Sequence, residues 1–570
     1  MRDAHLSNLL FGRISATTGL PRVNQIAPKV LFWRGIASNS PDLQGRYIKA
    51  MSNRRDFLKA GLVAAGTMPG ARAAASRPNI VLIMTDQQRA GLTRGSGFPL
   101  DTMPTLDRLA TNGVGFDRAY ATAPVCCPSR VSMLTGRWPH AHRVRENGGL
   151  KHATYAKDIV DVFRPQGYRV GLAGKNHSHI QPQHLDFCRQ YSHAGGWMPP
   201  DAPRQYAEFE KWLGSLHFHI SLEPAPFPAE VQHPHRIVSD AAEFIEGAGQ
   251  NPFLLWVSFP EPHPPYQVSR PYFDLFPPES VPERAAAPET LVRRNYKWRW
   301  MREAMDAAYP GYDAQWRRYR SVYLGALRMI DDQIARLVRL LEQRRLAENT
   351  IVVFVADHGD YFAEYGLWRK GVGMPETLIR IPMVWSGWNI APSRGNPAHV
   401  SIADVMPTLC EAAGLEVPLG VQGRSLWPML QGKTYPREEF RSIYAEVGFG
   451  GISYEESDHV PYSVATRKTS DGGILVDTLN SCTQSGYLKM VRMGDWKLLL
   501  DELGRGELYN LAQDPYELQN RFGDPAVLAE QAHLLQELMQ WGIRTEDSLP
   551  SAVYKAKWPA RNWYASYRHA

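Results

Sequence analysis

The chain has 570 residues, of which 44% are hydrophobic and 21% charged, an ordinary balance for a globular enzyme with one large domain and a smaller one. Its formal net charge is +7, but residues 1–75 hold eleven Lys and Arg against three Asp, so that segment carries +8 and the rest −1. Because the positive charge is confined to one end, the composition does not favour nucleic acid as a partner.

The N-terminal segment has the layout of an export signal. The pair Arg54-Arg55 precedes a short apolar run, Ala60–Met68, and small residues that suit cleavage follow it. This order is typical of a bacterial twin-arginine signal, and the run is too short for a stable membrane span. We therefore predict an upstream extension at 1–50, a signal peptide at 51–75, export through the Tat translocase, and a periplasmic or secreted location. The alternative is a basic turn before an ordinary helix.

Beyond this leader, apolar runs typical of β-strands alternate with helical stretches, which predicts a large, mainly parallel α/β sheet flanked by helices. Four of the runs end in polar clusters. Because ligands of open α/β sheets gather at the carboxyl ends of the strands, we expect these clusters to share one crevice. They are Asp86-Gln87 after NIVLIMT, Lys175, His177 and His179 after YRVGLAG, Glu261 and His263 in FLLWVSFPEPH, and Asp357, His358 and Asp360 after IVVFVA.

Helical periodicity and a change of texture divide the remainder of the chain. Apolar spacing predicts a long amphipathic helix at Tyr319–Leu346 and a short helix within Ala398–Gly414. From about residue 440, shorter strands and turns predict a small antiparallel sheet, followed by a helix near Ala526–Glu546. We therefore predict a catalytic domain at 76–440 and a smaller C-terminal α+β subdomain at 441–570.

Two adjacent cysteines stand out in the stretch PVCCPSRVSMLTGR, which begins at Pro124. Pro128 and the helical pattern after it place Cys126 or Cys127 near a helix N-terminus, where the helix dipole favours developing negative charge. A thiol phosphatase would require Cys-x5-Arg, a redox pair Cys-x-x-Cys, a zinc site further Cys or His, and a serine hydrolase Gly-x-Ser-x-Gly. None of these patterns is present in the sequence. Two small buried residues at a helix start are the structural alternative.

The same stretch resembles the signature of the type I sulfatases, which belong to the alkaline phosphatase superfamily. In that family the first cysteine of Cys-x-Pro-Ser-Arg is oxidised after translation to formylglycine. Cys126 occupies the matching position, and Cys127 occupies the variable place behind it. The resemblance extends from about Pro78 to Asn520, and its C-terminal part includes the segments ADVMPTL, GRSL and ELYNLAQDPYELQN.

The resemblance implies a metal site and a set of catalytic residues around it. One divalent cation, Ca²⁺ by resemblance and Mg²⁺ or Mn²⁺ as alternatives, would be bound by Asp86, Gln87, Cys126, Asp357 and His358. Oxygen ligands suit calcium or magnesium, whereas the ring nitrogen of His358 favours manganese or another transition metal. The implied catalytic residues are Cys126, Arg130, Lys175, His177, His263 and Lys370. Among these residues, Arg130 would hold the formylglycine.

The family reaction explains why such residues are needed. The oxygens of a sulfate ester carry negative charge that repels nucleophiles, and a cation beside Lys175 and Lys370 would neutralise it. By resemblance, one hydroxyl of the hydrated aldehyde attacks sulfur with Asp357 as base, and the second, deprotonated by His177, expels sulfate. His263 and Lys370 would protonate the leaving oxygen.

These implications predict a sulfatase that acts on a sulfated small molecule or glycan, with a formylglycine-generating enzyme as its partner during maturation. The Asp-Gln and Asp-His pairs leave open a phosphonate monoester hydrolase or phosphodiesterase of the same superfamily. A non-catalytic, exported glycan-binding protein on the sulfatase scaffold is the alternative from another class. No nucleic-acid partner is expected.

Overall fold

The computed structural model describes residues 77–469, 474–476, 481–547 and 549. The predicted upstream extension at 1–50 and signal peptide at 51–75 lie outside the described residues. Among the residues that are described, no helix has the length and apolar character needed to cross a membrane.

A nine-stranded sheet carries the fold, in the order β10-β2-β9-β8-β1-β7-β4-β5-β6. Its central neighbours β8, β1, β7 and β4 are all parallel, whereas β9 and β6 run antiparallel to their partners. The predicted large, mainly parallel sheet is therefore confirmed. The strands are β1 (Asn79–Asp86), β2 (Val114–Phe116), β4 (Arg169–Gly174), β5 (Phe187–Ser192), β6 (Gly195–Gly196), β7 (Phe253–Pro262), β8 (Thr350–Ala356), β9 (Met383–Gly387) and β10 (Ser393–Asn396).

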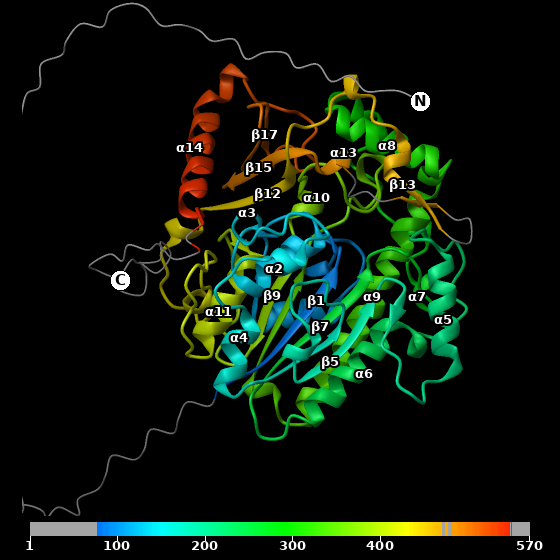
Figure 1. Ribbon diagram of the computed structural model, residues 1–570, viewed down its shortest axis with the longest axis vertical. Helices are drawn as coiled ribbons and strands as arrows, with labels where there is room; N and C mark the ends of the chain where they lie inside the picture. Colours follow the sequence, from blue (N-terminus) through cyan, green and yellow to red (C-terminus); the bar gives the residue numbers. More distant parts are fainter. Residues whose placement is uncertain (1–76, 470–473, 477–480, 548, 550–570) are drawn as a thin grey trace, which may run out of the picture. The chain divides into compact units, whose positions relative to one another are not determined.

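Both faces of this sheet are buried by helices, which explains the continuous apolar runs of its strands. Along β1, Val81 and Ile83 join one hydrophobic core while Leu82 and Met84 join another, as the two-residue period of a strand requires. Figure 1 shows α6 and α9 on one side of the sheet and α4 and α11 on the other. The first core includes α1 (Pro104–Thr111), α6 (His233–Glu246) and α9 (Trp316–Gln343); the second includes α2 (Cys126–Thr135), α4 (Ile159–Phe163) and α11 (Val405–Ala412).

The predicted helices form, with shifted ends. The long helix α9 starts three residues earlier than its apolar pattern, as a continuation of a 3-10 turn at Tyr312–Gln315. It ends at Gln343 because Arg345 adopts a left-handed conformation with φ 58°. The helix predicted within Ala398–Gly414 is shorter than that range, because the chain first forms strand β11 (Val400–Ser401) and another 3-10 turn.

The C-terminal part forms the predicted antiparallel sheet, in the order β12-β15-β16-β17. Helix α14 (Leu528–Arg544) packs against β15 and β16, where Leu534 and Trp541 join Val491 and Leu498 in a separate core. The strands are β12 (Ser442–Gly450), β15 (Gly486–Met493), β16 (Trp496–Asp501) and β17 (Gly506–Asn510). The remaining helices of eight or more residues are α5 (Arg204–Ser215) and α8 (Tyr296–Ala308).

A buried lysine links this second sheet to the short helix α10 (Glu376–Ile379) near the main sheet. The Lys497 ammonium on β16 is fully buried and lies 3.0 Å from Glu376 and 2.9 Å from Glu517. Burial alone would raise the pKa of Glu376, but Lys497 and Arg492 hold it at about 2. Because the lysine separates two buried carboxylates, the packing of the C-terminal sheet depends on its charge.

We expect Lys497→Met to destabilise the protein by about 3–5 kcal/mol, because it leaves Glu376 and Glu517 buried without their shared cation. Urea unfolding followed by tryptophan fluorescence measures the loss. Lys433→Met, at an exposed position, is the control and should change stability by less than about 0.5 kcal/mol. Equal stability of the two variants would contradict this role of Lys497.

Candidate active site

The polar clusters meet at the carboxyl edge of the main sheet. Strands β8, β1, β7 and β4 are neighbours in that order, and parallel strands end at the same edge. Asp86 is the last residue of β1, while Asp357, Lys175 and His263 follow β8, β4 and β7 directly. The order of the strands therefore brings together side chains that lie far apart in the sequence.

The backbone is constrained where these side chains enter the site. Gly174, with φ 119°, ends β4, and a Cβ there would lie 1.9 Å from the carbonyl oxygen of Ser258 on β7. Only glycine allows this approach, which lets the Lys175 amide donate to the same carbonyl at 2.7 Å. Gln87 and His177 also have positive φ angles of 66° and 45°. Non-glycine residues adopt that conformation at a cost, and such strain is concentrated at functional sites.

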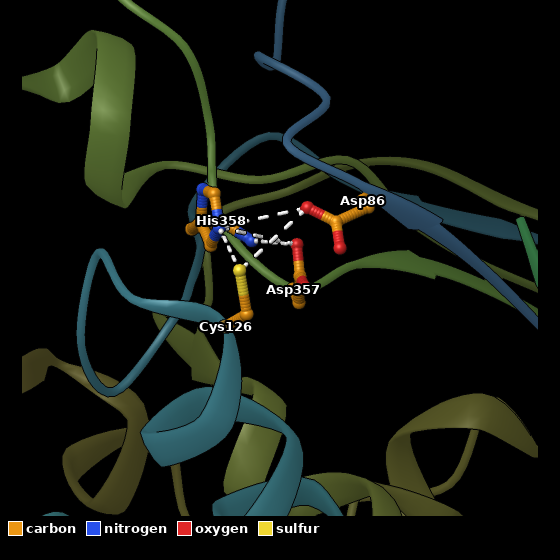
Figure 2. A group of neighbouring side chains, drawn as sticks. All are labelled: Asp86, Cys126, Asp357 and His358. Carbon is orange, nitrogen blue, oxygen red and sulfur yellow. Dashed lines mark hydrogen bonds and ion pairs between the residues drawn. The ribbon is translucent and has the colours of Figure 1, made fainter. Parts of the chain in front are cut away.

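Asp86, Cys126, Asp357 and His358 form a buried cluster whose potential ligand atoms all lie within 4.8 Å of one another. Figure 2 shows the four side chains pointing toward one another from the end of β1, the start of α2 and the segment after β8. The Cys126 sulfur lies 3.2 Å from His358 Nε2 and 3.7 Å from Asp86 Oδ1. His358 Nδ1 donates to the Gly359 carbonyl at 2.8 Å, so in the neutral ring the Nε2 lone pair faces the cluster.

This donor set fits a divalent cation. Two carboxylates and an imidazole nitrogen are ordinary ligands for such an ion, and the backbone hydrogen bond of His358 orients its ring as metal-binding histidines require. Gln87 lies beside the cluster, where its backbone amide donates to Asp357 Oδ1 at 3.0 Å. Its side-chain Nε2 donates to Asp360, and its Oε1 accepts from Lys370 at 3.0 Å. The lysine therefore shares the oxygen that the sequence predicts as a metal ligand.

Arg130 connects the two carboxylates. Its Nε donates to Asp357 Oδ2 at 2.8 Å and its Nη2 to Asp86 Oδ2 at 3.1 Å, with all three side chains fully buried. The same guanidinium donates to the Lys175 carbonyl and to Ser258 Oγ, both at 2.9 Å. The resemblance predicts that Arg130 holds the modified cysteine, whereas its hydrogen bonds here go to the aspartates, to Lys175 after β4 and to Ser258 within β7.

Two lysines add positive charge to the site. Lys175 Nζ donates to Asp86, and Lys370 Nζ donates to Gln87 Oε1; both side chains are almost fully buried. Burial alone would raise the pKa of Asp86, but Lys175 holds it well below its ordinary value with help from Arg130. With Arg130, three cationic groups face two aspartates, so the protein itself leaves a surplus of positive charge.

The two cysteines of the motif have different surroundings, although neither forms a disulfide. Helix α2 begins at Cys126, whose sulfur faces the cluster. Cys127 packs instead against Val131 and Val144 in a small apolar core, and burial raises the pKa of its thiol to about 12. Burial and Asp86 would also raise the pKa of Cys126, yet Lys370, Lys175 and His358 hold it well below its ordinary value. The two thiols differ accordingly: Cys126 is activated and Cys127 is inert.

His177 and His263 occupy the accessible side of the site and are partly exposed. His177 interacts with the Cys126 sulfur, and burial together with Lys175 lowers its pKa. His263 donates from Nδ1 to the Pro264 carbonyl at 2.8 Å, so its other nitrogen is available to a bound molecule. Burial, His193 and Lys370 hold the pKa of His263 well below its ordinary value. Both rings are therefore neutral in the absence of a ligand.

Two residues absent from the predicted set also contact the site. Asn147 accepts from the Cys127 amide at 3.0 Å and thereby caps α2, and its Nδ2 lies 3.8 Å from the Cys126 sulfur. His193, just after β5, accepts from Lys175 Nζ at 2.6 Å. Each stands alone in a loop without a motif, so the sequence contains no signal that could have identified it.

Two of the clustered polar residues that were not assigned to the predicted site, His179 and Glu261, lie beside it. His179 is 3.0 Å from Asp158, the residue whose side chain caps α4. This contact gives His179 a structural role. Glu261 is buried near His233, with its Oε1 3.6 Å from Nδ1 of that ring.

The fold is shared with phosphonate monoester hydrolases and with a sulfatase of known structure. A phosphonate monoester hydrolase from Silicibacter pomeroyi superposes with a TM-score of 0.69 at 21% identity, covering 85% of this chain and 99% of its own. The family model described as Sulfatase matches residues 78–415, more than half of the chain. The chain therefore belongs to the sulfatase family.

Curated relatives are similar over most of their length. The chain is 26% identical to an arylsulfatase of Clostridium perfringens over 78% of this chain and 90% of the relative. It is also 26% identical to a choline-sulfatase of Rhizobium meliloti, over 85% and 90% respectively. The predicted family membership and fold are thus confirmed, and the protein is a hydrolase of the sulfatase family.

We expect the purified protein to contain about one divalent cation per chain, and its removal to lower the melting temperature, because a bound ion stabilises only the folded state. Metal analysis before and after dialysis against EDTA measures both effects, and readdition of Ca²⁺, Mg²⁺ or Mn²⁺ ranks the ions. Asp357→Asn should abolish the thermal shift on readdition. Asp495→Asn, which alters an exposed ion pair with Arg118, is the control and should retain the thermal shift. Asp357→Asn with a full shift would contradict the assignment.

Proposed function

We propose that the protein is a sulfuric ester hydrolase that uses formylglycine, made from Cys126, and one divalent cation, with Ca²⁺ as the preferred ion. One observation carries the proposal: the sulfur of Cys126 is buried at the start of α2, 3.2 Å from His358 and 3.7 Å from Asp86, among Lys175 and Lys370. That arrangement supports Cys126 as the source of a nucleophile. Cys127 beside it is packed in an apolar core, as expected of a structural cysteine.

The charges of the site support an anionic substrate. Arg130 is occupied by the two aspartates, whereas Lys175 and Lys370 flank Cys126 and can approach the oxygens of a sulfate group. A cation held by Asp86, Asp357, His358, Cys126 and Gln87 would polarise the ester, and the hydrated aldehyde would supply the attacking hydroxyl.

The remaining residues would move protons. Asp357 is close enough to residue 126 to serve as the base for the attacking hydroxyl. His177, neutral and in contact with residue 126, would accept the proton of the second hydroxyl. Lys370, which retains its protons, would protonate the leaving oxygen. His263 would share this role after its Nε2 takes up a proton, because the neutral ring carries its proton on Nδ1. Asp357, His177 and Lys370 all lie near the sulfur of residue 126, which supports their joint action.

The proposal extends to maturation and location. A formylglycine-generating enzyme would convert Cys126, the segment at 51–75 would direct export by the Tat translocase, and the enzyme would work in the periplasm or outside the cell. Its substrate would be a sulfated small molecule or glycan, since one curated relative is named an arylsulfatase and another an ulvan-active sulfatase. The division into 76–440 and 441–570 is part of the same proposal.

Phosphonate monoester hydrolysis is the second candidate function. The Asp-Gln and Asp-His pairs leave it open, and two solved structures with this fold carry that name. Parallel assays with 4-nitrophenyl sulfate and a phosphonate monoester separate the two candidates by their kcat/KM values. A higher kcat/KM for the sulfate supports the proposal, and a higher value for the phosphonate favours the alternative. Turnover of neither, with an unmodified thiol at residue 126, favours the non-catalytic glycan-binding protein.

Cys126→Ala should lower kcat at least about 10³-fold, because it removes the only nucleophile that the mechanism uses. Cys127→Ala is the matched control and should keep kcat within a few-fold, since its thiol packs against Val131 and Val144. Peptide mass spectrometry should find the aldehyde at residue 126 in the wild type and in the Cys127 variant. Equal losses from the two substitutions would contradict the assignment of the nucleophile.

A further inference from the structure

His193 connects two of the predicted catalytic residues. Its Nε2 lies 2.6 Å from Lys175 Nζ, and its ring stacks on His263 with centroids 3.6 Å apart and planes 17° from parallel. Phe218 contacts both rings edge-on, at 5.7 and 6.0 Å. Lys175 and His263 lie on different strand ends, so a single ring holds their side chains in a common arrangement.

The bond to Lys175 determines which nitrogen of His193 carries a proton. An ammonium group can only donate, so Nε2 of His193 is the acceptor. In the neutral ring the proton then resides on Nδ1, which is buried and has no hydrogen-bond partner among the described residues. A buried donor without a partner is rare in folded proteins and points to an acceptor that completes it.

A small cavity behind His193 contains the matching acceptors. It measures about 10 Å³, close to the minimum for one water, and is lined by His193, His263, Glu261, Gln267 and His233. Glu261 Oε2 and Gln267 Oε1 are buried and likewise lack partners among the described residues. One donor and two acceptors are what a single water needs, because it can accept one hydrogen bond and donate two.

The far side of the cavity is fixed by charged groups. His233 donates from Nε2 to Glu210 at 2.9 Å, and Arg236 donates to the same carboxylate at 2.7 Å. The other ring nitrogen of His233, Nδ1, lies 3.6 Å from Glu261 Oε1. Burial raises the pKa of Glu261 to about 7, which is consistent with a carboxyl that shares protons with its neighbours. The sequence interpretation assigned no function to Glu261.

We propose that His193 is a positioning residue for the reaction, which orients Lys175 and His263, and that Glu261 and Gln267 fix its tautomer through one buried water. The expected effect on kcat rests on the proposed function, whereas the hydrogen-bond arrangement around His193 does not depend on it. Loss of the acceptor on His193 would allow Lys175 to turn further toward Asp86, and loss of the ring would remove the surface on which His263 stacks.

A crystal structure at high resolution tests the arrangement whether or not the enzyme is a sulfatase. The expected result is one ordered water within hydrogen-bond distance of His193 Nδ1, Glu261 Oε2 and Gln267 Oε1, with Lys175 Nζ on His193 Nε2. A cavity without density for a water, or His193 Nδ1 bonded directly to a protein group, would overturn the proposed role of Glu261, Gln267 and the buried water.

Kinetics test the positioning role, on whichever ester the wild type hydrolyses better. His193→Phe keeps an aromatic ring for stacking but removes the acceptor, and we expect kcat to fall about 10- to 100-fold with little change in KM. His193→Gln can still accept from Lys175 but offers no ring to His263, so it should recover part of that loss. Glu261→Gln, which disturbs the tautomer but not the ring, should lower kcat less than His193→Phe.

Controls separate this role from a general effect on folding. His219→Phe alters a histidine whose ring contacts Tyr309, and it should have wild-type kcat. Melting temperatures and metal content are measured for every variant. If His193→Phe keeps wild-type kcat, or if His193→Gln loses as much activity as His193→Phe, the positioning role is wrong. If the wild type turns over neither ester but the buried water is present, the proposed function fails and the hydrogen-bond arrangement stands.

Discussion

The buried contacts of Arg130 are the interaction on which the site depends. Two aspartates at the ends of neighbouring strands carry like charges that repel each other in a dry interior. Arg130 spans Asp86 and Asp357 with two hydrogen bonds and also donates to the Lys175 carbonyl after β4 and to Ser258 Oγ on β7. One guanidinium thereby pairs with both carboxylates and connects four neighbouring strands of the sheet. A buried charge is tolerable only with such complete pairing.

This pairing has consequences for the chemistry. Because the aspartates are already held by Arg130, their other oxygens and the nitrogen of His358 can face a cation, with the Cys126 sulfur beside them. Lys175 and Lys370 then add positive charge at almost complete burial, where electrostatic attraction to an anion is stronger than in water. The partly exposed rings of His177 and His263 mark the side from which a ligand can enter.

Patterns local to the chain predicted much of this. The apolar runs before Asp86 and Asp357 indicated buried parallel strands, and both form adjacent strands of the main sheet. The amphipathic spacing from Tyr319 predicted α9 to within three residues at its start, and the dense motif around Cys126 predicted a helix that begins there. In each case neighbouring residues carry the information, because helix and strand periods are properties of short segments.

Other features became visible only in three dimensions. Asn147 and His193 are single polar residues in loops, and their contacts with the Cys127 amide and with Lys175 depend on how those loops fold back over the sheet. Lys497 likewise reads as an ordinary strand residue until its burial between two glutamates is seen.

The sequence by itself determined the fold class, the strand ends and the identity of the cysteine motif, since these depend on periodicity and on contiguous residues. Only the tertiary structure decided which side chain touches which: that Arg130 bonds the aspartates, that Gln87 shares its oxygen with Lys370, and that a histidine outside any motif supports Lys175. The physical reason is that such contacts are set by strand order and loop packing, which join residues distant in the chain and leave no local pattern behind.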